Sequence, residues 1–194
     1  MERYNPEALL PPWLSKFSAG DEGALLSDEE RMRFAVGLAR QNVLHGTGGP
    51  FGAAVFDRST GRPVAVGVNR VVGSNCSHAH AEMVALAIAE QQLSSYTLNR
   101  PGFARYELVT SSEPCAMCFG AIIWSGVSRL VCGACTADAE DAGFDEGAKP
   151  EQWTQELEKR GIEVLTGLCR NEAVSVLQLY VNRGGKLYNG QPRQ

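Results

Sequence analysis

The chain has 194 residues, of which 44% are hydrophobic and 21% charged, and its formal net charge is -4. These values are typical of a globular protein with one domain and a core of normal size. They argue against a partner with a long phosphate backbone, because such binding depends on many Lys and Arg side chains. We see no apolar run long enough for a membrane span or a secretory signal, so we expect a cytoplasmic protein whose six cysteines stay reduced.

Residues 1–26 are predicted to form an N-terminal arm, because their prolines break any long helix. The segment is too apolar for a free tail, so we expect it to pack on the domain or on a second subunit. Ser27 followed by Glu30 is a capping-box pattern, which predicts a helix from this point to about Leu44. Helical spacing places five apolar residues on its inward side, namely Met32, Ala35, Val36, Ala39 and Val43. Its solvated side is expected to carry Arg31, Arg33 and Arg40.

After this helix, short strands alternate with helices, and the elements are predicted from their apolar spacing and their flanking turn residues. Strands are expected at 52–56 and 63–68, which form a hairpin, and at 106–110, 129–132 and 163–165. Helices are expected at 79–93, 115–124, 151–159 and 171–181, and the acidic segment 138–150 is expected to be a loop. We therefore predict a domain at 27–181 and a C-terminal tail at 182–194. The fold class is α/β, a three-layer α/β/α sandwich with a mixed sheet of about five strands.

Two short segments at predicted helix starts carry side chains that can bind a metal. One contains His80 and Glu82, and the other runs from Pro114 to Cys118, with Cys115 and Cys118 one helical turn apart on the same face. An imidazole and two thiolates can hold a tetrahedral zinc ion with one position open, as a catalytic site requires. Glu82 is expected to act as a proton carrier beside that open position and not as a ligand. We therefore predict a catalytic Zn²⁺ site at His80, Cys115 and Cys118.

A second Cys-x-x-Cys motif leaves an alternative open. Cys132 and Cys135 could join Cys115 and Cys118 in a structural four-cysteine zinc site, which would make the chain a binding module without an open metal position. The connecting residues 119–130 are mostly apolar, however, and predict a core helix and strand where a zinc ribbon usually has short polar knuckles. Cys132 is then a buried thiol within an apolar strand.

The combination of His-x-Glu with a later Pro-Cys-x-x-Cys is the signature of zinc-dependent nucleobase deaminases. At these motifs the sequence resembles the cytidine and deoxycytidylate deaminase superfamily, over residues 30–190. More narrowly, it is similar to the bacterial guanine deaminases of this fold at residues 49–53, 69–72, 113–119 and 143–147. The resemblance implies a hydrolase that converts guanine, a small purine base, to xanthine and ammonia.

The resemblance also implies roles for residues outside the metal site. It implies that Asn69 hydrogen-bonds the purine, that Phe51 packs on its ring, and that Glu146 is a second proton carrier. It places Ala81 among the substrate contacts and lets Tyr188 cap the pocket. It further implies a homodimer whose C-terminal segments cross over to complete the partner's site. Other substrates stay open at this point, because pocket shape sets the choice between guanine, tRNA adenosine, cytosine, guanosine and an aminotriazine such as ammeline.

Overall fold

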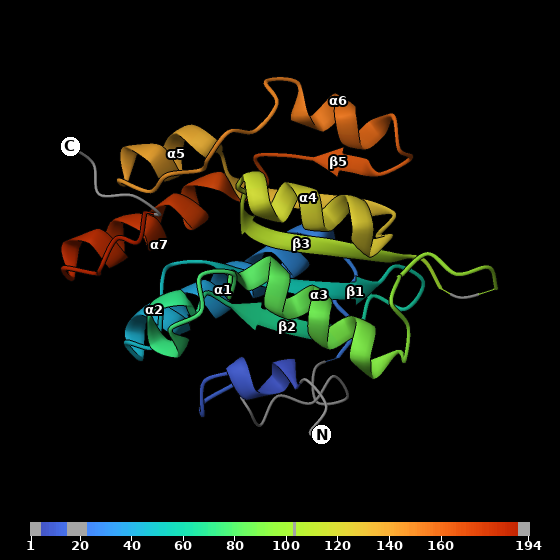
Figure 1. Cartoon of the computed structure of the whole chain (residues 1–194), viewed down its shortest axis with the longest axis horizontal. Coiled ribbons are helices and arrows are strands. Elements are labelled where there is room, and N and C mark those ends of the chain that lie inside the picture. Colours follow the sequence, from blue (N-terminus) through green and yellow to red (C-terminus); the bar gives the residue numbers. More distant parts are fainter. Residues whose placement is uncertain (1–4, 15–22, 103, 190–194) are drawn as a thin grey trace.

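A computed structural model of the chain describes residues 5–14, 23–102 and 104–189. Its strands form one mixed five-stranded sheet in the order β2-β1-β3-β4-β5 (Figure 1). β1 pairs antiparallel with both β2 and β3, whereas β4 runs parallel to β3 and to β5. The strands are β1 (Gly52–Asp57), β2 (Pro63–Val68), β3 (Tyr106–Ser112), β4 (Arg129–Ala134) and β5 (Glu163–Leu165).

Helices cover both faces of this sheet and produce three layers, with α3 and α4 side by side in front of the sheet in Figure 1. One face is covered by α1 (Asp28–Leu44), α5 (Thr136–Asp141) and α7 (Arg170–Asn182). The other face is covered by α3 (Ala81–Gln92), α4 (Ala116–Ser125) and α6 (Trp153–Glu158). Two further short elements are η1 (Pro6–Leu9) and α2 (Val71–Ser74). The predicted fold class is confirmed.

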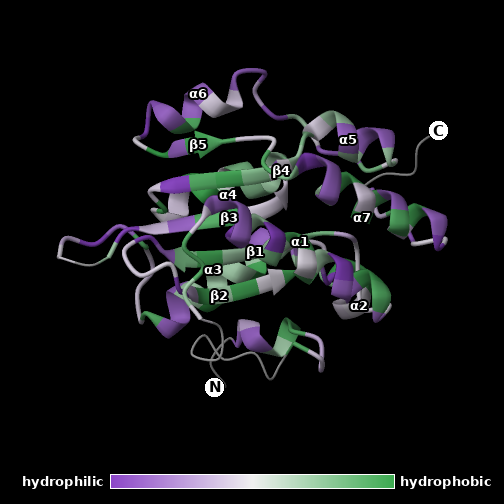
Figure 2. Cartoon of the chain, turned by 180° about the vertical axis from the view of Figure 1, so that it is seen from behind, coloured by the Kyte–Doolittle hydropathy of each residue, from purple (hydrophilic) through white to green (hydrophobic). Residues whose placement is uncertain are grey.

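The alternation of side chains along the strands divides the interior into two cores. On β1, Ala54 and Phe56 belong to the core under α1, whereas Ala53 and Val55 belong to the core under α3. Figure 2 shows the resulting arrangement, with hydrophobic strands in the middle and more hydrophilic helices outside. Gly67 on β2 lets α3 approach the sheet closely, since a Cβ there would lie 2.1 Å from the carbonyl oxygen of Ala81. The first turn of α3 is thereby fixed directly on the sheet.

Most elements match the sequence predictions. The capping box is present, because the Ser27 hydroxyl accepts from the backbone N–H of Glu30 and the Glu30 carboxylate accepts from that of Ser27. The five apolar residues predicted to face inward from this helix are all buried. None of the helices in the described parts of the chain is long and apolar enough to cross a membrane.

Two expectations are wrong. Arg31 does not lie on a solvated helix face: it is 8% exposed and donates to Glu107, a carboxylate that is completely buried. The segment 138–150 is not a loop throughout, since Asp138 lies within α5 and its carboxylate accepts from the backbone N–H of Cys135 at the start of that helix. The predicted arm is described only at 5–14 and 23–26, where Leu14 is buried against the domain, and the last five residues of the predicted tail lie outside the described residues.

Candidate active site

The imidazole of His80 and the thiols of Cys115 and Cys118 meet at the N-terminal ends of two helices. His80 is the N-cap of α3, and Cys115 is the N-cap of α4. Nδ1 of His80 lies 3.5 Å from Sγ of Cys115 and 3.7 Å from Sγ of Cys118. Tetrahedral zinc with its usual bonds to nitrogen and sulfur would separate such atoms by about 3.6 Å. The distances from the imidazole to both sulfurs therefore match those around a zinc ion, and all three possible ligand atoms lie within 4.8 Å of one another.

The surroundings favour the deprotonated thiol that a metal requires. A hydrogen bond from Cys118, with a further contribution from His80, lowers the pKa of the Cys115 thiol to about 4 in spite of burial. Cys115 caps α4 and Cys118 lies in its first turn, where the helix dipole stabilises negative charge. The hydrogen bond with Cys115 and burial raise the pKa of the Cys118 thiol, so that Cys115 is the first of the pair to lose its proton.

The four-cysteine alternative does not match the geometry. Among the residues that the structure describes, the only cluster suited to a metal contains His80, Cys115 and Cys118. Cys132 is fully buried on β4 within the apolar core, and the thiol of Cys135 donates to the carboxylate of Asp138 at 3.0 Å. These two cysteines serve the core and the cap of α5.

A pocket opens beside the metal cluster, and it brings together most of the residues singled out in the sequence. Seven of those residues line it, namely Phe51, Asn69, His80, Glu82, Cys115, Glu146 and Tyr188. Cys118 belongs to the metal cluster but does not line the pocket. Ala81 is fully buried and does not line it either. Six further lining residues belong to the segments that carry the family resemblance but were given no role in the site, namely Gly49, Val71, Val72, Glu113, Phe144 and Asp145. Sequence reasoning missed the other two, Tyr180 and Lys186.

Two carboxylates in the pocket are almost completely buried. Glu82 is 6% exposed and Glu146 is 7% exposed, and the loss of water around them raises the pKa of both. For Glu146 the pKa rises to about 8, and the nearby Cys115 and Glu82 contribute to the rise. Burial thus favours the protonated form of both acids, and it allows Glu146 to hold a proton near neutral pH, as a proton carrier must. The backbone carbonyl of Glu146 accepts from the N–H of Ala116 at 2.9 Å, which attaches its loop to the first turn of α4.

The wall opposite the metal cluster is aromatic. Phe51 meets Phe144 edge to face, with ring centroids 4.9 Å apart, and Phe144 stacks on Tyr180 at 6.0 Å. Beside this wall, the side-chain oxygen of Asn69 faces the backbone N–H groups of Gly49 and Val71, at 3.4 and 3.3 Å. Its NH₂ group is then available to a ligand that offers an acceptor. The pocket can hold a flat aromatic ring and donate a hydrogen bond to its edge.

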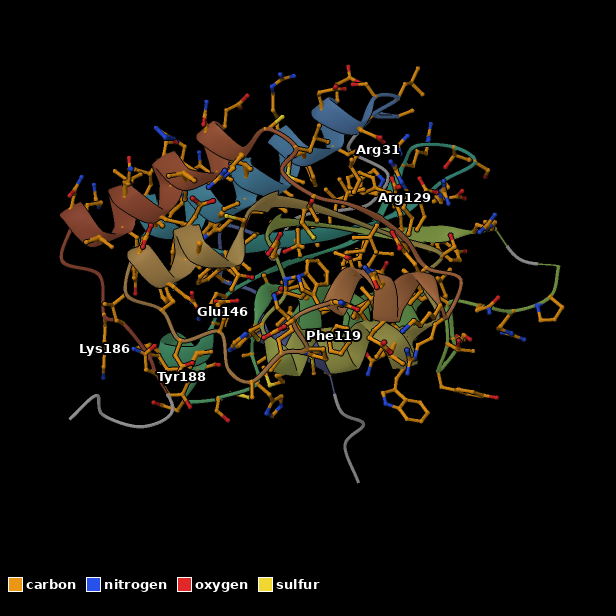
Figure 3. All side chains as sticks on the ribbon, turned by 90° about the horizontal axis from the view of Figure 1, so that it is seen from above. Arg31, Phe119, Arg129, Glu146, Lys186 and Tyr188 are labelled. Carbon is orange, nitrogen blue, oxygen red and sulfur yellow. The ribbon has the colours of Figure 1, made fainter. Side chains whose placement is uncertain are left out.

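The C-terminal tail completes the pocket of its own chain, with Glu146, Lys186 and Tyr188 close together in Figure 3. The hydroxyl of Tyr180 on α7 donates to the carbonyl of Lys186 at 2.7 Å. The side-chain amide of Asn189 donates to the carbonyl of Gly143 and accepts from the N–H of Asp145, at 3.1 and 2.9 Å. The tail and the loop that carries Glu146 therefore hold each other in place.

A second set of bonds fixes the other side of that loop. The ammonium of Lys149 donates to the carbonyl of Pro114 and to the hydroxyl of Thr136, both at 2.8 Å. The Thr136 hydroxyl in turn donates to Glu113, which lines the pocket. Nothing in the sequence around Lys149 indicates this contact, because its partners lie 35 and 13 residues away.

Comparisons with known proteins agree with this geometry. The family of the cytidine and deoxycytidylate deaminase zinc-binding region matches residues 26–134. The guanine deaminase of Bacillus subtilis strain 168 is 37% identical over 137 residues, which cover 71% of this chain and 83% of that protein. The solved structure of a guanine deaminase from Nitrosomonas europaea is 49% identical with a TM-score of 0.84, covering 88% of this chain and 93% of that chain. A further structure, 49% identical with a TM-score of 0.86, covers 93% of this chain and 94% of that chain and contains 2,6-diaminopurine.

Proposed function

The chain belongs to the cytidine and deoxycytidylate deaminase family, and we propose that it deaminates guanine hydrolytically to xanthine and ammonia. The observation that carries the proposal is the position of two buried carboxylates, Glu82 and Glu146, in one pocket with a His-Cys-Cys cluster and an aromatic wall. The two relatives named as guanine deaminases support the choice of substrate.

His80, Cys115 and Cys118 are the residues that would hold zinc. When bound there, zinc supplies a Lewis acid that makes water a stronger acid and nucleophile at neutral pH. Glu82 then takes one proton from the attacking water and delivers it to N3 of the purine, while a new C–O bond forms at C2. The second proton of that water is passed by Glu82 or Glu146 to the amine on C2, the C–N bond breaks, and ammonia leaves. Xanthine thus retains the oxygen of the water and its first proton, on N3, and ammonia leaves with the second proton.

Recognition of the base follows from the other walls of the pocket. Phe51 and Phe144 provide an apolar surface for the purine ring, and the NH₂ group of Asn69 donates to an acceptor on its edge. Tyr188 and Lys186 limit the pocket on the side of the tail. A free base fits this closed arrangement better than a nucleotide within an RNA chain. The acidic balance of the protein also gives little support to tRNA as a substrate.

A homodimer with exchanged C-terminal segments and a cytoplasmic location stay predictions. In a single chain the tail already lines its own pocket, so exchange would have to form the same contacts with the tail of the partner. Light scattering on the purified protein would give the oligomeric state. Disulfide trapping in the double variant Gly143→Cys and Asn189→Cys would then show whether tail and loop belong to one chain or two.

The proposal is tested by metal analysis together with a panel of guanine, adenine, cytosine, guanosine and ammeline. We expect about one zinc per chain and the fastest ammonia release with guanine. Glu82→Gln is expected to retain zinc and to lose a factor of about 10²–10⁴ in turnover. Glu90→Gln on the same helix lies outside the pocket and serves as the matched control. Full activity in Glu82→Gln, or zinc binding unchanged by His80→Ala, would contradict the proposed site.

A further inference from the structure

The loop that carries Asn69 is held from below by a buried asparagine on α1. Asn42 is completely buried, and its side-chain NH₂ donates to the carbonyl oxygens of Gly49 and of Asn69, both at 2.8 Å. These two carbonyls belong to the two segments that meet at the pocket. Asn42 therefore sets the distance between Gly49 and Asn69, although it does not line the pocket itself.

The packing at this point leaves no room for adjustment. A Cβ at Gly48 would lie 1.8 Å from the carbonyl oxygen of Asn69 and 2.8 Å from the side-chain nitrogen of Asn42. Gly49 packs less tightly against the side chain of the same residue, since a Cβ there would lie 3.1 Å from the side-chain oxygen of Asn69. The position of Asn69 consequently depends on the orientation of the Asn42 amide.

That orientation is set from the N-terminal arm. The hydroxyl of Thr47 donates to the side-chain oxygen of Asn42 at 2.7 Å, which leaves the Asn42 nitrogen for the two carbonyls. The indole N–H of Trp13 donates to the same Thr47 hydroxyl at 3.0 Å. Trp13 also stacks on His45, with ring centroids 5.3 Å apart and planes at 11°. A continuous chain of hydrogen bonds thus runs from Trp13 through Thr47 and Asn42 to Asn69.

The arm has a second connection to the same place. The guanidinium of Arg70, the residue next to Asn69, donates to the carbonyls of Leu9 and Thr47. Arg70 is partly buried, and burial lowers its pKa. Two separate parts of the arm therefore reach this region, Leu9 at Arg70 beside Asn69 and Trp13 at Thr47.

From these contacts we propose that the N-terminal arm is part of the substrate-recognition apparatus, with Trp13, Thr47 and Asn42 as positioning residues for Asn69. The inference rests on the proposed function, because it assigns the arm a role in binding the purine. Asn69 can donate to the base only while its side-chain oxygen stays with the N–H groups of Gly49 and Val71. If the Asn42 amide is no longer held in one orientation, the side-chain oxygen of Asn69 is no longer held toward these two N–H groups. Binding of the base then weakens, while Glu82 and Glu146 keep their positions.

The test compares Thr47→Val, which removes the hydroxyl at nearly constant volume, with Thr47→Ser, which keeps it. Trp13→Phe removes the indole N–H and retains a ring over His45. Thr60→Val, at an exposed position in the turn between β1 and β2, is the matched control. For each variant, KM and kcat for guanine are measured together with zinc content and the melting temperature.

We expect Thr47→Val to raise KM about five- to tenfold, the loss that one or two hydrogen bonds represent, with kcat changed less than about twofold. Trp13→Phe should raise KM in the same direction, and Thr47→Ser and Thr60→Val should leave it unchanged. A merely structural role would lower the melting temperature and the active fraction, hence kcat, at constant KM. That pattern, or an unchanged KM in Thr47→Val, would overturn the inference.

A measurement without guanine separates this inference from the proposed function. Hydrogen exchange of the backbone N–H groups of Gly49 and Val71 should accelerate in Thr47→Val and not in Thr47→Ser. If the wild-type protein releases no ammonia from guanine, the proposed function fails whatever the exchange rates are. If guanine is deaminated and exchange at these two positions is the same in Thr47→Val as in wild type, the positioning role fails alone.

Discussion

Glu107 is the residue whose replacement should cost the most stability without touching the active site. Its side chain is completely buried on β3, where it accepts from Arg31 on α1 and from Arg129 on β4 at 3.0 Å. Arg129 is also held by Asp28, through two bonds of 2.7 Å. Figure 3 shows Arg31 and Arg129 close together and well apart from Glu146.

Glu107→Gln keeps the shape of the side chain and removes its charge, so that two buried guanidinium groups lose one carboxylate. Removing one partner of a buried ion pair costs about 3–5 kcal/mol in free energy of unfolding. We expect the free energy of unfolding to fall by about 3 kcal/mol, at the lower end of that range, because Asp28 and Glu163 still contact Arg129. For a chain of this size, that loss lowers the melting temperature by about 6–12 °C.

Thermal and urea unfolding of Glu107→Gln measure this loss, with Glu156→Gln as the control. Glu156 pairs with Lys159 and Arg160 on the surface of α6, and its removal should leave the melting temperature nearly unchanged. The turnover of the folded fraction of Glu107→Gln should equal that of the wild type. If Glu107→Gln lowers the melting temperature no more than Glu156→Gln does, burial does not increase the contribution of the Glu107 carboxylate to stability.

Two further predictions concern single carboxylates. Glu146→Gln should keep zinc and the melting temperature, while turnover of guanine falls by a factor of about 10² or more. Glu151→Gln, in the same segment between α5 and α6, is the control and should have no effect. An unchanged rate in Glu146→Gln would leave that residue without a catalytic role. The hydrogen bond from Arg129 lowers the pKa of Asp28, so its stabilising contribution is complete above the ordinary value of about 3.9 and disappears as the pH falls through the lowered value. The difference in unfolding free energy between wild type and Asp28→Asn should therefore shrink in acid, and a difference that is the same at every pH would contradict this assignment.

The parts of the structure that the sequence predicts correctly are those fixed by contacts close in sequence. The capping box of Ser27 and Glu30, the hairpin of β1 and β2, and the spacing of Cys115 and Cys118 depend on residues within a few positions of each other. The metal cluster is an exception, because His80 lies 35 positions from Cys115 and 38 from Cys118. The sequence predicts that they meet only because the two short motifs together form the deaminase signature.

The parts that the sequence does not predict depend on partners far away along the chain. Arg31 looks like a surface residue until β3 brings Glu107, 76 positions away, to its guanidinium. The short helix α5 is stabilised by Arg170 of α7, whose guanidinium binds Asp138 through two bonds of 2.8 Å. Tyr180 fits the apolar pattern of a core helix, and only the fold shows that it lines the pocket and holds the tail at Lys186.

This division corresponds to two different tasks within the site. In the proposed mechanism, reaction at C2 of a purine depends on the metal cluster and Glu82, which are attached to the first turns of α3 and α4 and hence to the sheet. Recognition of the base depends on loops, and loops become rigid only through contacts that other segments provide. Here the arm supplies those contacts for Asn69, and the tail supplies them for the loop of Glu146. Changes in the arm and the tail are therefore expected to alter affinity for the base before they alter metal binding, because no described residue of either segment belongs to the metal cluster.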